Sequence, residues 1–268
     1  MPLLPPARPL FLAVVHLLPT PGSPRSDGSL ARVVARAVED ARALVQGGAD
    51  GLIVENYGDA PFFPGRVPSE TVAALALCTS AVIAAAGAIP VGVNVLRNDA
   101  RSALGVCAAT GARFLRVNVH SGVAATDQGV IEGRAHETLR ERARLAPGCA
   151  ILADVHVKHA TPLGRESLAD AVREHIQRAL ADAVIVSGPR TGAPPTIPEL
   201  REAREAASGT PVLIGSGLTS DNARELLPLA DGAIVGTALE RGGCTAEPVE
   251  LERVQRMRKV FDALRARG

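Results

Sequence analysis

Aromatic side chains are scarce in this 268-residue chain, which has no tryptophan, one tyrosine and five phenylalanines. A protein that stacks nucleic-acid bases on aromatic rings needs more of them. Positive and negative charges are nearly balanced, because the chain has 29 basic and 28 acidic residues. Without a basic surface to meet a phosphate backbone, we expect no nucleic-acid partner.

Cysteines are few and widely spaced. The chain has no C-x-x-C spacing, and its four cysteines are Cys78, Cys107, Cys149 and Cys244. This pattern argues against a disulfide framework and against a zinc knuckle. It indicates free thiols in a reducing compartment, so we expect a cytoplasmic protein.

The uncharged segment Thr71–Leu96 comes nearest to a transmembrane helix. A spanning helix needs about 20 strongly apolar residues, whereas this segment is rich in alanine and is interrupted by Gly87 and Pro90. The sequence therefore predicts a buried helix, a turn and a strand here, and no transmembrane segment.

Three catalytic signatures are missing as well. The chain has no G-x-x-x-x-G-K-S/T, no G-x-G-x-x-G after its first apolar run and no H-E-x-x-H. These absences argue against a P-loop triphosphatase, a dinucleotide-binding fold and a zincin protease.

Aliphatic residues are abundant instead, since 47% of the chain is hydrophobic and only 2% aromatic. Branched aliphatic cores are typical of (β/α)8 barrels.

Short apolar runs alternate with amphipathic segments along the whole chain. The predicted strands are 10–17, 51–56, 90–96, 114–120, 150–156, 183–187, 211–215 and 233–236. The predicted helices are 30–46, 69–86, 98–110, 132–146, 166–180, 197–208, 220–228 and 248–266. Eight regular units with no linker predict one domain, 1–268, folded as a single (β/α)8 TIM barrel rather than an open doubly wound sheet.

Polar residues gather at the predicted strand ends, where barrels of this kind carry out catalysis. Side chains alternate along a strand, so Asp154, His156 and Lys158 should share the inward face of the fifth strand. The catalytic candidates are Glu55, His120, Asp154, His156 and Lys158. The substrate-binding candidates are His16, Asn56, Tyr57, Asn94 and Asn118. Lys158 could form a Schiff base if its pKa were lowered, or could hold an anion or pair with Asp154.

Glycine-rich turns follow the last three predicted strands. Glycine lets the backbone approach a ligand closely, and the loops after strands seven and eight commonly bind phosphate in these barrels. The predicted phosphate-binding residues are Ser187, Gly188, Gly215, Ser216, Gly217, Gly236 and Thr237. We therefore expect a phosphorylated small molecule as the ligand.

Three connections, 19–28, 57–68 and 121–132, are long for loops between a strand and a helix. Long loops in compact domains often serve as lids. We expect Tyr57 and the segment Asp127–Gly129 to close over a bound ligand.

The chain resembles the BtpA/SgcQ family along nearly its whole length. The matching segments are 16–24, 50–59, 92–100, 116–120, 127–133, 154–160, 215–219 and 235–237. The resemblance implies a TIM-barrel-like fold. The family's name comes from a protein linked to photosystem I biogenesis and associated with thylakoid membranes. Other members occur without photosynthesis, some beside sugar-metabolism genes, so the resemblance implies no catalytic residue.

Three functions remain open. The first is an enzyme, a lyase or aldolase, an isomerase or a hydrolase, acting on a phosphorylated sugar or nucleoside-like metabolite. The second is a hydrolase that depends on a divalent metal, whose candidate ligands are His16, Glu55, His120, Asp154 and His156. The third is a non-catalytic assembly factor for a membrane complex such as photosystem I. The alanine-rich outer helices also suggest a homo-oligomer.

Overall fold

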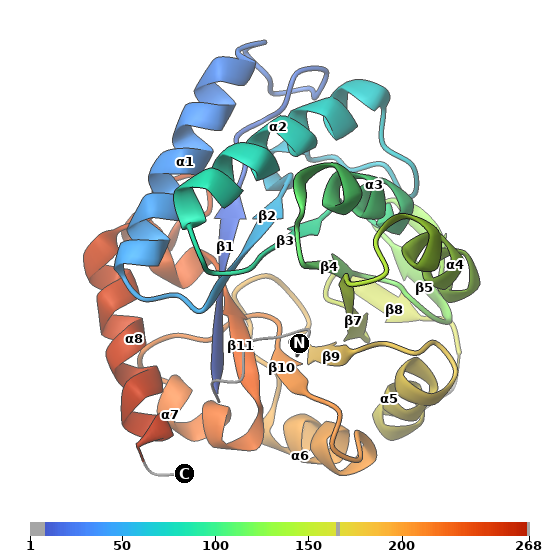
Figure 1. Ribbon diagram of the computed structural model, residues 1–268. Helices are drawn as coiled ribbons and strands as arrows, with labels where there is room; N and C mark the ends of the chain where they lie inside the picture. Colours follow the sequence, from blue (N-terminus) through green and yellow to red (C-terminus); the bar gives the residue numbers. More distant parts are fainter. Residues whose placement is uncertain (1–8, 165–166, 267–268) are drawn as a thin grey trace.

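The computed structural model describes residues 9–164 and 167–266. Within them, eight parallel strands close into a barrel in the order β1-β11-β10-β9-β7-β4-β3-β2, with helices around the outside (Figure 1). The strands are β1 Leu10–His16, β2 Gly51–Glu55, β3 Val91–Asn94, β4 Phe114–Val117, β7 Ala150–Val155, β9 Ala183–Val186, β10 Val212–Ile214 and β11 Gly232–Val235. The predicted (β/α)8 barrel is confirmed.

Eight α-helices occur in the described part of the chain, one after each barrel strand. They are α1 Leu30–Gln46, α2 Ser69–Ala86, α3 Ala100–Thr110, α4 Ala135–Leu145, α5 Leu168–Gln177, α6 Ile197–Ala206, α7 Ala223–Leu226 and α8 Leu251–Arg265. The predicted start of the fifth helix, residue 166, lies outside the described residues. The helix predicted over 220–228 is one short turn, followed by a 3-10 turn that contains Pro228. Proline lacks the N–H that a continuing helix requires.

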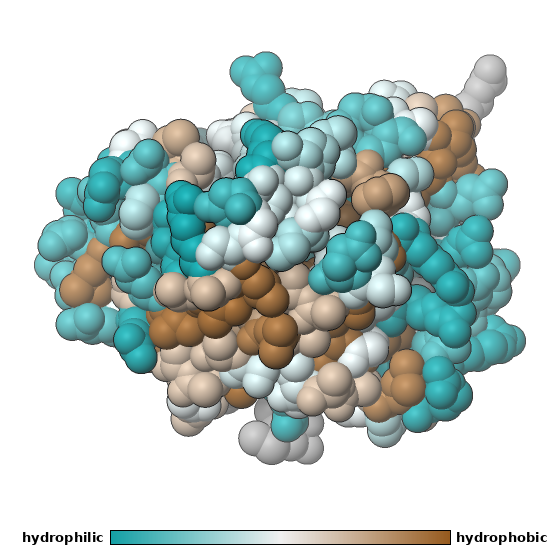
Figure 2. Space-filling model, turned by 90° about the horizontal axis from the view of Figure 1, so that it is seen from above, coloured by the Kyte–Doolittle hydropathy of each residue, from teal (hydrophilic) through white to brown (hydrophobic). Residues whose placement is uncertain are grey.

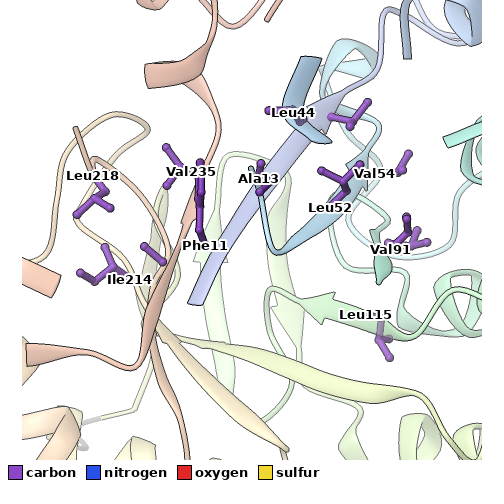
Figure 3. Packing of buried hydrophobic residues seen from close by; sticks show 14 of the residues in the cluster. Phe11, Ala13, Leu44, Leu52, Val54, Val91, Leu115, Ile214, Leu218 and Val235 are labelled. Carbon is purple, nitrogen blue, oxygen red and sulfur yellow. The ribbon is translucent and has the colours of Figure 1, made fainter. Parts of the chain in front are cut away.

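The main hydrophobic core lies between the barrel and its helices. Alternate strand residues such as Phe11, Leu52 and Leu115 point outward and are fully buried (Figure 3). Phe11 stacks on Phe261 of α8 with ring centroids 4.8 Å apart. The scarce aromatic residues are therefore used partly to seal the last helix onto the first strand.

A second, smaller core fills the barrel itself. It contains the residues of the other parity, among them Leu12, Ile53, Phe114 and Leu152. Gly92 makes room for the largest of them, because a Cβ at that position would lie 2.3 Å from the Phe114 ring. The interior is therefore a packed core, and a ligand can bind only above it, at the strand ends.

The long connection 121–132, whose segment Asp127–Gly129 is expected to close over a ligand, is an ordered β-hairpin rather than an irregular loop. Its strands, β5 Val123–Thr126 and β6 Gly129–Glu132, pair with each other, and β5 also pairs with β8, Ala160–Pro162. The hairpin rests on a small apolar cluster of its own, formed by Val119, Ala124, Ile131 and Val157. It lies beside the C-terminal ends of β4 and β7.

One helix in the described residues, α2, is long and apolar enough to cross a membrane when judged by length and composition alone. In the barrel it lies against α1, and its Leu75, Cys78 and Val82 are buried. The uncharged segment of the sequence is therefore an outer barrel helix followed by β3, as its pattern predicts.

Candidate active site

The inward-facing residues change from apolar to polar at the C-terminal ends of the strands. Leu12, Ile53 and Leu152 belong to the barrel interior. Two residues beyond Ile53 and Leu152, on the same strands and with the same parity, lie the buried polar residues Glu55 and Asp154. Buried Asn94 ends β3, and buried Arg116 follows Phe114 by two residues on β4. Strand alternation explains this layer, since every second residue must point into the barrel.

Arg116 and Asp154 form a buried ion pair at the centre of the polar layer. The guanidinium donates from Nε to Asp154 Oδ2 and from Nη2 to Asp154 Oδ1, both at 2.8 Å. Asn118 Nδ2 donates to the same carboxylate at 2.9 Å, and Ser187 Oγ donates to it at 3.4 Å. Asp154 is thus held by four hydrogen bonds, which suits a carboxylate that positions its neighbours better than one that moves protons.

Glu55 has a freer carboxylate. Asn94 Nδ2 donates to its Oε2 at 2.6 Å, and His16 Nε2 lies 3.8 Å from its Oε1. Burial alone would raise the pKa of Glu55, but the charges of His16, Arg116 and Lys158, together with the Asn94 hydrogen bond, outweigh burial and lower that pKa. Glu55 is therefore an anion near neutral pH, available to accept a proton.

Lys158 lies beyond the end of β7, near Glu55, Asp154 and Arg116. Burial, and then the positive charge of Arg116, lower the pKa of Lys158, although Glu55 and Asp154 oppose the change. A lysine of lowered pKa can act as an acid–base or nucleophilic group. Its backbone carbonyl accepts a hydrogen bond of 2.6 Å from Arg97 Nη2, which fixes this part of the loop.

Two cavities open at this end of the barrel, with volumes of about 410 Å³ and about 260 Å³. Both are lined by Glu55, Tyr57, Arg116, Lys158 and Thr191, so they are two lobes of one mouth. The glycine lobe, the larger, is also lined by Gly215, Ser216, Gly217, Gly236 and Thr237. The arginine lobe, the smaller, is also lined by Arg25, Asn94, Arg97, Asn118 and Asp127.

The glycines of the larger lobe are required by packing. A Cβ on Gly236 would lie 2.5 Å from the His16 ring, and one on Gly217 would lie 2.1 Å from the backbone of Pro194. Ser216 Oγ donates to the carbonyl of Ala193 at 2.8 Å and accepts from Gly188 N at 3.2 Å. These turns are therefore rigid, and they leave backbone facing the cavity.

Two of the predicted phosphate residues lie beside the lobe rather than in its wall. Ser187 and Gly188 do not line either cavity. Ser187 donates toward Asp154, and a Cβ on Gly188 would lie 2.4 Å from the Ala193 carbonyl. Both residues support the loop that follows β9.

His16, Asn56 and Tyr57 are placed around Glu55. His16 Nδ1 lies 2.7 Å from Glu240 Oε1, and the Tyr57 ring lies 4.9 Å from the His16 ring. Asn56 accepts a hydrogen bond from Leu96 N and donates to Asp59, so its amide joins two loops. Tyr57 and His16 line the mouth, whereas Asn56 lies behind it.

His120 and His156 are placed outside the mouth. The alternation of inward and outward side chains ends before these histidines, since β4 ends at Val117 and β7 at Val155. The backbone of His156 is left-handed, with φ 51°. His120 lies under α5 with Nε2 2.9 Å from the Ala179 carbonyl, and burial lowers the pKa of His120 to about 4. His156 lines a small cavity of about 30 Å³ beneath the hairpin.

The five candidate metal ligands do not converge. No three histidine, cysteine, aspartate or glutamate side chains in residues 9–164 and 167–266 group closely enough to hold a metal ion. His16 and Glu55 are neighbours, but His120 and His156 lie elsewhere and Asp154 is engaged by Arg116. The residues present therefore do not fit the metal-dependent hydrolase.

Sequence reasoning missed three buried charged residues of the site, Arg97, Arg116 and Glu240. Arg116 has the same parity as Phe114 on β4 and as Asn118 just after that strand, and this parity was the available signal. Glu240 contacts His16 although the two residues are 224 positions apart in the sequence. Nothing in the sequence indicates that contact.

Comparison with known proteins places the chain in a family. A model described as the BtpA family matches residues 7–263. The chain belongs to the BtpA family. One relative is the photosystem I biogenesis protein BtpA of Synechocystis sp., 51% identical over 91% of this chain and 84% of that protein. Another is an uncharacterized protein of Pyrococcus abyssi, 45% identical over 95% of this chain and 96% of that protein.

Among solved structures, this BtpA-family chain is similar to phosphoribosyl anthranilate isomerase from Thermus thermophilus. The TM-score is 0.58 at 14% sequence identity, and the match covers 95% of this chain and 100% of that chain. At such low identity the likeness shows the shared barrel fold and nothing about the reaction.

Proposed function

We propose that this BtpA-family chain is a cytoplasmic enzyme that acts on a phosphorylated small molecule, a sugar phosphate or a nucleoside-like phosphate. The observation that carries the proposal is the position of Glu55 and Lys158, which lie in the wall shared by both lobes of the mouth. A molecule whose phosphate occupied the glycine lobe would extend past these two groups.

The reaction supported best is an isomerisation or a carbon–carbon cleavage that proceeds by proton transfer. Glu55, an anion of lowered pKa, would accept a proton from carbon or from a hydroxyl group. Lys158 would stabilise the developing negative charge on the neighbouring oxygen or return a proton to it. A Schiff base between Lys158 and a substrate carbonyl is a second use of the same lysine.

The glycine lobe is the proposed phosphate site. It is formed by the loops after β10 and β11, where phosphate binds in many barrels. Rigid glycine turns present backbone N–H groups at low steric cost, and Arg253 and Arg256 of α8 stand at the outer edge.

The first test is a thermal-shift panel of phosphorylated metabolites with each metabolite's unphosphorylated parent beside it. A ligand at about 100 times its Kd adds about 2.7 kcal/mol of stability. Ala238 lines the glycine lobe, so Ala238→Asp should abolish the shift by repelling the phosphate, while the isosteric Ala238→Asn should keep most of it. Equal shifts with phosphorylated and unphosphorylated compounds, or equal effects of the two variants, would contradict a phosphate site here.

Borohydride separates the two uses of Lys158. If a Schiff base forms, water is lost and borohydride adds two hydrogens, so reduction with a carbonyl-bearing ligand from the panel adds the ligand's mass less one oxygen to the peptide that contains Lys158. If Lys158 acts only as a cation, the mass stays unchanged and Lys158→Arg retains part of the turnover.

A role in assembling a membrane complex is the second candidate. The Synechocystis relative is named for photosystem I biogenesis, and one side of this barrel exposes apolar residues of α2 such as Leu77. Under this hypothesis, variants of Leu77 would impair assembly in cells while Glu55→Gln would leave it intact. The enzyme hypothesis predicts instead that Glu55→Gln would abolish the effect of the protein in cells.

A further inference from the structure

The arginine lobe contains a buried cation that the proposed reaction leaves unused. Arg97 is only 4% exposed, yet it lines this cavity. Its Nη2 donates to the carbonyl of Lys158, whereas its Nε has no hydrogen-bond partner among the described residues. No ion pair within residues 9–164 and 167–266 includes Arg97.

Such an arrangement is costly when nothing is bound. A buried charge without a partner destabilises the folded state unless an opposite charge reaches it. The neighbouring Arg116 is already neutralised by Asp154 through two hydrogen bonds of 2.8 Å. Arg97 has no equivalent carboxylate, and an anion arriving in the cavity would supply one.

The charges around the cavity favour an anion. Its wall contains four cationic side chains, Arg25, Arg97, Arg116 and Lys158, against two carboxylates, Glu55 and Asp127. Asp127 lies exposed at the tip of the hairpin, where Gln128 Nε2 donates to its Oδ2 at 2.5 Å. Because Arg25 is exposed as well and Asp154 neutralises Arg116, the charges deep in the lobe are the cations of Arg97 and Lys158 against the carboxylate of Glu55.

We propose that the arginine lobe is a subsite for a carboxylate of the same substrate whose phosphate occupies the glycine lobe. The planar guanidinium of Arg97 matches a carboxylate in geometry and charge, and Asn118 adds an amide to the same wall. The substrate class is then a phosphorylated sugar acid, with Glu55 and Lys158 facing the carbons between its two anionic ends. This inference rests on the proposed function.

Two matched pairs of compounds test the subsite. In each pair a CH2OH group replaces the carboxylate: sn-glycerol 1-phosphate with D-3-phosphoglycerate, and sorbitol 6-phosphate with 6-phosphogluconate. Dissociation constants are measured by calorimetry at fixed ionic strength. In the wild-type protein the carboxylate should improve affinity about tenfold or more in at least one pair, as a charge-assisted hydrogen-bonded contact does.

The variant Arg97→Met should bring the two members of that pair within about twofold of each other, because the carboxylate then has no guanidinium to bind. The control is Arg113, an exposed arginine just before β4. Arg113→Met removes the same charge far from the mouth and should keep the preference for the carboxylate compound. If Arg97→Met does not fold, Arg97→Lys keeps the charge, loses the planar fork and should reduce the preference in part.

The outcomes separate the two proposals. If both members of each pair bind equally well, the carboxylate subsite is wrong and the phosphate site stands. If no member of either pair binds at millimolar concentration, both proposals fall. A preference for carboxylate that survives in Arg97→Met would also overturn the assignment of the subsite to Arg97.

Discussion

The reactivity of Lys158 depends on the residues that surround it. The chain has only two lysines, Lys158 and Lys259, against 27 arginines. An arginine stays charged at any pH at which the protein is folded, whereas the pKa of a lysine responds to burial. Among the lysine and arginine side chains of the mouth, Lys158 is therefore the one that can lose its proton and react.

The lowered pKa of Lys158 makes a prediction about pH. The charged form is disfavoured in the folded protein, so Lys158 should become a free amine at lower pH than the lysine of an unstructured reference peptide. Competitive acetylation across a pH series, read by mass spectrometry, should give half-maximal labelling of Lys158 at the lower pH. Because the comparison uses midpoints rather than rates, burial alone does not create the difference. Coincident midpoints would contradict the argument.

The sequence makes Asp154 a candidate for proton transfer, whereas its hydrogen bonds with Arg116 favour a structural role. Its carboxylate pairs with the buried guanidinium of Arg116, so removing it leaves an uncompensated charge inside the barrel. We expect Asp154→Ala to lower the free energy of unfolding by about 3–5 kcal/mol. Urea denaturation measures this, and the double variant Arg116→Met, Asp154→Ala should recover part of the loss. A loss below about 1 kcal/mol would show that the pair is not a structural unit.

Among the elements, the hairpin of β5 and β6 is the one that we expect to move as a unit. It rests on a small apolar cluster separate from the main core, and its outer face is exposed, including Val130. Elements with few buried apolar contacts open at low free-energy cost. Its tip residue Asp127 also lines the arginine lobe, so hydroxyl groups of a ligand there can donate hydrogen bonds to the Asp127 carboxylate and hold the hairpin in place.

Hydrogen exchange tests the hairpin as a lid. Amides of residues 121–132 should exchange more slowly in the presence of the tightest-binding compound of the phosphorylated panel. Amides of α4, directly after the hairpin in the chain, should not change. Equal exchange of the hairpin with and without ligand would reject the lid, and equal slowing of α4 would indicate general stabilisation instead.

For the whole molecule, the side of the barrel that carries α1 and α2 has a different character from the mouth. Figure 2, seen from above, shows hydrophobic residues lying side by side there among hydrophilic ones. Leu77 of α2 is 54% exposed, and between Glu70 and the end of α2 at Ala86 there is no charged residue. Apolar patches of this kind often mark contacts between copies of a protein.

We therefore expect a homo-oligomer that uses the α2 side. Light scattering coupled to size exclusion should give a mass above that of one chain, and Leu77→Glu should shift it toward the monomer. Leu163 is exposed to the same extent, 55%, but lies beside β8, so Leu163→Glu is a matched control that should not dissociate the assembly. A wild-type protein of monomer mass would refute the oligomer.

The sequence by itself determined the barrel and the inward positions of Glu55, Asn94 and Asp154. Eight alternating units and a strict two-residue period inside strands fix these features, because both follow from local backbone geometry. The glycine turns after β10 and β11 could be placed for the same reason.

Only the tertiary structure decided what happens beyond the strand ends. His120 and His156 leave the mouth because β4 and β7 end before them and the backbone turns. Arg97 reaches the Lys158 carbonyl from 61 residues away, and Glu240 reaches His16 from 224 residues away. Loop side chains follow no period, and contacts between distant loops depend on how the closed barrel brings its strand ends together.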